Sequence, residues 1–165
     1  MKSLQQISLQ LIAESRGHTV TNNARLWLSA WGELPTEDEI ASVKLEALKI
    51  RKPMTLGNKR YHEEIAGFTL SETDTVLDGK FVRTDERSQQ KISDGLLLAT
   101  RDPDNFSRDW KFSDTWVELN AELMILIATK FEEFQQATRA KLKAKEEAVA
   151  SATSIEDVQA ITWAS

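Results

Sequence analysis

The hydrophobic positions of the N-terminal third recur at helical spacing. Ser3 with Gln6 and Thr36 with Glu39 have the form of capping boxes, in which each partner satisfies a free amide of the first helical turn. Pro53 is expected to end the last of these helices, because a proline removes a backbone hydrogen bond inside a helix. The pattern therefore predicts three helices, over residues 3–17, 23–31 and 36–53.

Beyond Pro53 the spacing of the hydrophobic residues switches more than once between the helical period and strand-like alternation. A short helix is expected to end at Gly67, and residues 67–84 then alternate between apolar and polar. Their dipeptide Asp78-Gly79 is typical of a hairpin turn. After a predicted helix over 86–99, a second hairpin is expected to turn at Ser113-Asp114. Alternation places four of its side chains on one face of each strand: Trp110 and Phe112, then Val117 and Leu119.

A long helix is predicted over residues 120–150. Its first half carries an apolar stripe of Leu123, Ile127, Phe131 and Phe134. At 1.5 Å per residue the helix is about 46 Å long, which exceeds the roughly 30 Å of a small domain. Its C-terminal half is therefore expected either to project or to pack against another part of the chain. A capping box at Thr153–Glu156 then begins a terminal helix that ends near Ile161.

The order of these elements predicts an α+β fold. A helical N-terminal extension precedes two β-hairpins interleaved with helices, including one long C-terminal helix and a short terminal helix. The change of pattern near Pro53 divides the chain into two predicted domains. Residues 1–55 form the helical extension, expected to serve partner or oligomer contacts, and residues 56–165 form the α+β domain.

Charge and composition exclude several classes of function. The chain of 165 residues has a net charge of −5 and no cysteine, so disulfides and thiolate metal sites are excluded. An acidic chain without a concentrated basic face is not expected to bind nucleic acid. The longest apolar run, residues 123–128, is far shorter than the roughly 20 residues that span a bilayer, and no signal peptide is evident, so a soluble protein without membrane contact is expected.

No motif predicts catalysis. The two histidines, His18 and His62, lack a ligand partner at metal-site spacing, and residues 102–110 depart from a calcium loop at Phe106. No phosphate-binding glycine motif is present. Adjacent carboxylates such as Glu63-Glu64 are typical of solvated helix faces. We therefore expect no enzyme activity, no cofactor and no metal.

Several aromatic and basic residues are candidates for partner contact. Trp27 and Trp31 lie one helical turn apart in a short predicted helix, where they are either core or a partner surface, and Trp163 near the C-terminus has the same two interpretations. Arg83 and Arg87 flank the predicted start of the 86–99 helix, where they are either solvent-exposed side chains without a partner role or partner contacts. Trp110 and Trp116, on the second hairpin, are expected in the core.

Residues 60–163 resemble a domain of unknown function found in tailed bacteriophages and prophages, often encoded among tail-fibre and tail-assembly genes. The resemblance is carried by four segments, taken in order: "IAGF" at 65–68, "DGKFVRTDERSQQKI" at 78–92, "ATRDPDNFSRDWKFSDTWVELNAELMILIA" at 99–128 and "EEAVASATSIEDVQAITW" at 146–163. In this resemblance Thr84 and Asp85 correspond to the cap between strand and helix.

The resemblance implies a setting and no catalytic residues. The protein is expected to be a non-enzymatic structural or adaptor protein of the virion tail, present in the host cytoplasm during assembly. Its expected partners are other tail or tail-fibre proteins and further copies of itself. The alternative is a chaperone that binds the tail fibre during morphogenesis.

Overall fold

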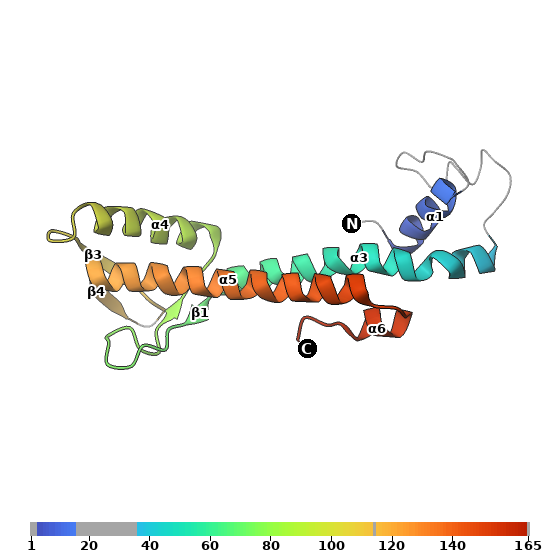
Figure 1. Cartoon of the computed structure of the whole chain (residues 1–165). Helices are drawn as coiled ribbons and strands as arrows, with labels where there is room; N and C mark the ends of the chain where they lie inside the picture. The colour runs from blue at the N-terminus through green and yellow to red at the C-terminus, as the bar shows by residue number, and fades with distance from the viewer. Residues whose placement is uncertain (1–2, 16–35, 114, 165) are drawn as a thin grey trace. The chain divides into compact units, whose positions relative to one another are not determined.

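A computed structural model describes residues 3–15, 36–113 and 115–164 (Figure 1). Over these ranges the chain mixes helices and strands, which confirms the predicted α+β class. The helices are α1 (Leu4–Ser15), α3 (Glu37–Ala66), α4 (Glu86–Arg101), α5 (Ala121–Ser151) and α6 (Ile155–Ala160). The strands are β1 (Phe68–Thr69), β2 (Phe81–Val82), β3 (Ser107–Lys111) and β4 (Trp116–Asn120).

The chain forms two compact units. The terminal unit comprises Met1–Lys59 and Leu142–Ser165, and the central unit comprises Arg60–Lys141. Helices α3 and α5 therefore each contribute residues to both units. The division into functional domains at residues 55 and 56 stays a prediction.

Helix α3 does not end at Pro53, so that expectation is wrong. The helix runs from Glu37 to Ala66 with Pro53 inside it, and it also includes the short helix predicted before Gly67. A proline already has a helical φ, and its cost inside a helix is a lost hydrogen bond and a ring clash with the preceding turn. Packing of the neighbouring turns offsets such a cost, as Ala47 and Leu56 on either side of Pro53 are buried.

The core of the terminal unit joins residues from both ends of the sequence. Buried Leu56 packs with Val149 and Val158, and the lysines of α3 bind carbonyl oxygens at the C-terminal end: Lys49 donates to Ala150 at 3.1 Å. The C-terminal half of α5 therefore packs rather than projects. A second cluster is formed by Leu9, Ile12, Ala13 and Val43.

The core of the central unit lies between α4, the hairpin β3–β4 and the first half of α5 (Figure 1). Met124 and Ile127 of α5 are fully buried; of the predicted apolar stripe, Ile127 and Phe131 are buried and Leu123 and Phe134 are half-buried, whereas Met124 was not predicted. Met124 and Ile127 pack with Ile92 of α4 and with Phe112 and Leu119 of the hairpin. Within the described ranges, every helix is too short or too polar to cross a lipid bilayer.

The first hairpin is shorter than its sequence pattern predicts. Phe68 pairs with Val82 and Thr69 with Phe81, and a long connection separates these two-residue strands. Asp78-Gly79 forms a turn at the end of that connection: the Lys80 amide donates to the Leu77 carbonyl at 3.0 Å, and Gly79 has a φ of 69°. Glycine adopts this left-handed conformation at little cost, which explains the dipeptide.

The second hairpin has the predicted register. Trp110 pairs with Val117 and Arg108 with Leu119, so these four side chains share the face that meets the core. The helix that precedes it, α4, is capped by Asp85, whose carboxylate accepts a hydrogen bond from the Ser88 amide. Both the hairpin and the cap agree with the sequence prediction.

Candidate functional site

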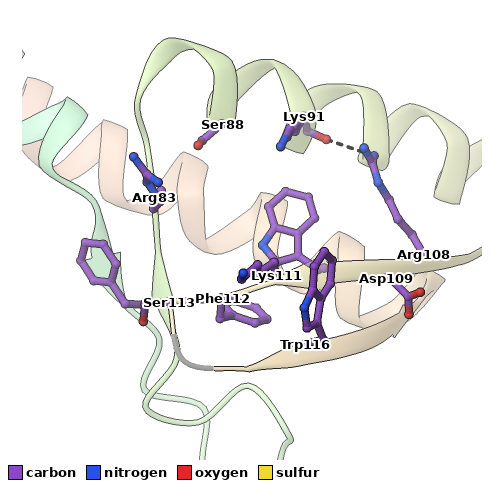
Figure 2. A pocket seen from close by; sticks show the side chains of 11 residues that line it. Arg83, Ser88, Lys91, Arg108, Asp109, Lys111, Phe112, Ser113 and Trp116 are labelled. Atoms are coloured by element: carbon purple, nitrogen blue, oxygen red, sulfur yellow. Dashed lines mark hydrogen bonds between the residues drawn. The ribbon is translucent and has the colours of Figure 1, made fainter.

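A pocket of about 530 Å³ lies on the central unit between β2, the first turns of α4 and the hairpin β3–β4 (Figure 2). Such a volume is within the range of ligand sites in proteins. Its lining is aromatic and basic: Phe81, Arg83, Ser88, Lys91, Arg108, Asp109, Trp110, Lys111, Phe112, Ser113 and Trp116.

The wall formed by β2 and α4 is held in place by a buried hydrogen bond. Thr84 is completely buried, and its hydroxyl donates to the backbone carbonyl of Glu64 at the end of α3. The side-chain amide of Gln89 donates to the Thr84 carbonyl at 2.7 Å. These bonds fix the chain directly after Arg83, which lines the pocket.

The Phe81 ring lies so close to the backbone at position 67 that only a glycine fits there. Gly67 has a φ of 92°, and a Cβ atom added there would lie 2.4 Å from Cζ of Phe81 and 2.6 Å from the Val82 carbonyl oxygen. Real Cβ atoms do not approach other atoms so closely. The positive φ and the close approach together explain why the residue before β1 is a glycine.

Two of the basic side chains of the pocket lie over tryptophan rings. The Arg108 guanidinium is 5.7 Å from the centroid of Trp110, and the Lys111 ammonium is 5.5 Å from that of Trp116. Both distances are typical of cation–π contacts. Arg108 also donates to the carbonyl of Lys91 at 3.5 Å, which ties β3 to α4 across the pocket (Figure 2).

The carboxylate nearest to Arg83 is that of Asp85, at 3.4 Å. The Ser88 hydroxyl donates to Asp85 at 2.8 Å, and this bond, followed by the bond from the Ser88 amide, holds the pKa of Asp85 below its usual value. Asp85 is therefore ionised at neutral pH and balances Arg83. The excess positive charge of the pocket then comes from Lys91, Arg108 and Lys111, against Asp109.

Of the residues predicted to contact partners, Arg83 and Arg87 belong to the central unit and Trp163 to the terminal unit. Arg83 lines the pocket, whereas Arg87 lies exposed in the first turn of α4 and is not part of the lining. Trp163 is half-buried against the core of the terminal unit. Trp27 and Trp31 fall outside the described residues. Their roles in partner contact stay predictions.

The sequence prediction for Trp116 is wrong. This side chain was expected in the core, yet 63% of its surface is exposed. Alternation along β4 gives the reason, because Val117 and Leu119 face the core and Trp116 must then face outward. The same alternation was available in the sequence. No local signal, however, indicated that Lys91, Arg108 and Lys111 would meet at one pocket.

The lining residues offer groups that can bind anionic and apolar partners. The Ser88 hydroxyl is bound to a carboxylate, and no histidine is among the lining side chains. His62 lies exposed on α3 beside Tyr61, with ring centroids 5.8 Å apart. In the described part of the chain, His, Asp and Glu side chains form no group of three or more that would hold a metal ion. Guanidinium, ammonium and indole groups together recognise anionic and apolar groups.

Comparison with known families gives a match over most of the chain. A family model described as "Domain of unknown function (DUF4376)" matches residues 47–162, which include all of the central unit. No curated protein and no solved structure matches the chain.

Proposed function

The chain belongs to the DUF4376 family, a domain of unknown function, and we propose that it is a non-enzymatic component of a bacteriophage tail that acts by binding other proteins. Its partners in this proposal are other tail or tail-fibre proteins and further copies of the chain. It is located in the virion tail, and in the host cytoplasm during assembly.

The observation that carries the binding role is the exposed indole of Trp116 in a pocket rich in cations. An indole with 63% of its surface in water contributes little to its own fold. Tryptophan and arginine are enriched among the residues that dominate protein interfaces, where the indole supplies a large apolar surface and a hydrogen-bond donor. A second exposed apolar surface on the same unit, Leu97 and Leu98 of α4, supports the same role.

The setting is supported by the resemblance of residues 60–163 to a domain encoded among tail genes. The long helices also suit a role in assembly. In the terminal unit, α3 and α5 bring residues from the two ends of the sequence into one core, so a partner would meet a surface built from both helices.

Quantitative mass spectrometry of purified mature particles tests the setting. We expect a fixed number of copies per particle in the phage that encodes the chain. Absence from both particles and fibre complexes contradicts the proposal. Absence from particles, with the chain bound to a fibre protein in the lysate of infected cells, instead supports the alternative of a tail-fibre chaperone.

A pair of variants tests the binding role in the same experiment. Trp116→Ala removes the exposed indole of the pocket and is expected to lower the number of copies per particle. Tyr61→Ala removes another exposed ring of the central unit outside the pocket and is expected to leave that number unchanged. Equal incorporation of both variants contradicts the role assigned to Trp116.

A further inference from the structure

We propose that the pocket of the central unit binds an extended, acidic segment of a partner polypeptide along the free edge of β3. This inference rests on the proposed function, since it specifies the chemistry of the partner segment. It is carried by three features of the pocket: its charge, the unpaired backbone of β3 and its exposed aromatic rings.

The charge of the pocket is opposite to that of the whole chain. Its lining carries four basic side chains and one acidic side chain, although the chain has a net charge of −5. Among the described residues, neither Lys91 nor Lys111 takes part in an ion pair with an acidic side chain. A carboxylate entering between them therefore gains attraction without displacing an existing ionic partner.

The backbone of β3 has an edge that faces away from β4. The Phe112 amide donates to the Thr115 carbonyl at 2.9 Å, which places Phe112, Trp110 and Arg108 at the positions that bond to β4. The backbone groups of Asp109 and Lys111 then point the other way, and no other described strand pairs with them. A peptide that adds as a further strand satisfies such groups.

The position of the pocket agrees with strand addition at this edge. All residues from Arg108 to Ser113 line it, and the opposite wall comes from β2 and α4; of the described residues of β4, Trp116 alone takes part. In Figure 2, α4 lies on the side of β3 that is remote from β4. The pocket therefore borders the β3 edge where the unpaired backbone groups lie.

The aromatic rings provide contacts for alternate side chains of the added segment. Trp116 is 63% exposed and Phe81 is 37% exposed, and both line the pocket. Successive side chains of an extended peptide point to opposite faces. Each face of β3 offers both a cation and a ring, Lys111 with Trp116 and Arg108 with Trp110, so a segment that carries both acidic and apolar side chains would find contacts on either face.

A single-stranded nucleic acid fits this surface less well than a peptide does. Asp109 and Glu118 are cross-strand partners, and both side chains are exposed next to the basic groups. A phosphate backbone carries a charge at every nucleotide and would meet this acidic pair, whereas a peptide can place an apolar side chain there. Nor does it carry the regularly spaced amides and carbonyls that pair with a strand edge.

The test is a titration of the purified full-length chain with a short synthetic peptide in which glutamate and valine alternate. The indole N–H signals of the five tryptophans, assigned with Trp→Phe variants, report binding by NMR. We expect saturable shifts of the Trp110 and Trp116 signals, weakened by added salt. The Trp163 signal, from the terminal unit, is expected to stay unchanged.

Matched variants and probes separate the three features. Lys111→Glu and Trp116→Ala are expected to weaken binding about tenfold or more. Lys44→Glu makes the same charge change on the exposed face of α3, and Val76→Ala removes another exposed apolar side chain of the central unit; both should bind as the natural chain does. A peptide with N-methyl groups at alternate residues keeps its charge but cannot pair with a strand edge, and is also expected to bind about tenfold more weakly.

Three results would overturn the inference: no shift of the Trp116 signal, equal weakening by Lys44→Glu and Lys111→Glu, or tighter binding of an oligothymidine of similar charge. Failure here is distinguishable from failure of the proposed function. A chain that is present in particles but binds no acidic peptide keeps its place in the tail and loses this site. A chain that binds the peptide but is absent from particles and fibre complexes retains the site without the setting.

Discussion

The hydroxyl of Thr138 on α5 donates a hydrogen bond of 3.2 Å to a carboxylate oxygen of Glu64 on α3, across 74 residues of sequence. Glu64 is 8% exposed, and the same oxygen is 2.9 Å from the Arg60 guanidinium. Thr84 binds the backbone of Glu64 as well. One residue near the end of α3 therefore joins α3, α5 and the segment that leads into α4.

Replacement of Glu64 by alanine is expected to destabilise the chain by about 1–3 kcal/mol, because the half-buried Arg60 loses its ionic partner and Thr138 keeps only its bond to the Gln135 carbonyl. Glu64→Gln keeps the shape and an acceptor for Thr138 and should cost less. The control is Glu147→Ala, which removes an exposed partner 4.0 Å from Lys143 and should cost about 0.5 kcal/mol or less. Chemical denaturation followed by circular dichroism measures all three, and equal losses for Glu64→Ala and Glu147→Ala would contradict the buried role.

Two glycine-to-alanine variants are expected to have opposite effects. Gly67→Ala should destabilise the chain by more than about 1 kcal/mol, because alanine is strained at a φ of 92° and its Cβ would meet the Val82 carbonyl. Gly57 lies inside α3, and a Cβ there meets nothing within 4 Å. Gly57→Ala should therefore stabilise the chain by about 0.5–1 kcal/mol. Thermal melting compares them, and a loss of stability in both would be evidence against this account of Gly57.

The bond from Ser88 to Asp85 predicts a dependence on pH. The pKa of Asp85 is lowered in the folded chain relative to its ordinary value of 3.8, so its contribution to stability is present above that value and is lost as the pH falls through the folded pKa. Ser88→Ala removes the first cause of the shift. The pKa of Asp85, measured by NMR of its carboxyl carbon, should then rise toward 3.8, and the stability difference from the natural chain should shrink in acid. An unchanged pKa would assign the shift to Arg83 or to the Ser88 amide.

The two tryptophans of the second hairpin are expected to differ in their effect on stability. Trp110 packs against the central core, and Trp110→Ala should cost about 2 kcal/mol or more. Trp116 is exposed, and Trp116→Ala should change the free energy of unfolding by about 0.5 kcal/mol or less. Urea denaturation of the two variants measures this difference. If Trp116→Ala costs as much as Trp110→Ala, the indole of Trp116 belongs to the core.

Two of the three predicted capping boxes form at the predicted residues, and the third forms one residue later. Ser3 and Gln6 exchange hydrogen bonds of 3.2 and 2.8 Å, as do Thr36 and Glu39, and both capping boxes were predicted. The last box is shifted by one residue, to Ser154 and Asp157 instead of Thr153 and Glu156. Both pairs satisfy the local pattern, so the sequence alone did not distinguish between them.

Sequence by itself determined the elements whose causes are local. Capping residues, the turn glycine at 79, the register of the second hairpin and the apolar stripe of α5 each depend on neighbours in the chain. The course of α3 through Pro53, the packing of α5 against α3 in the terminal unit and the basic, aromatic pocket depend on contacts between distant residues. Arg83 lies in the connection before α4, Lys91 in α4 and Lys111 in β3, and no local sequence pattern records the distances between them. Tertiary structure alone decided where they meet, because the free energy that brings them together comes from burial of the core beneath them.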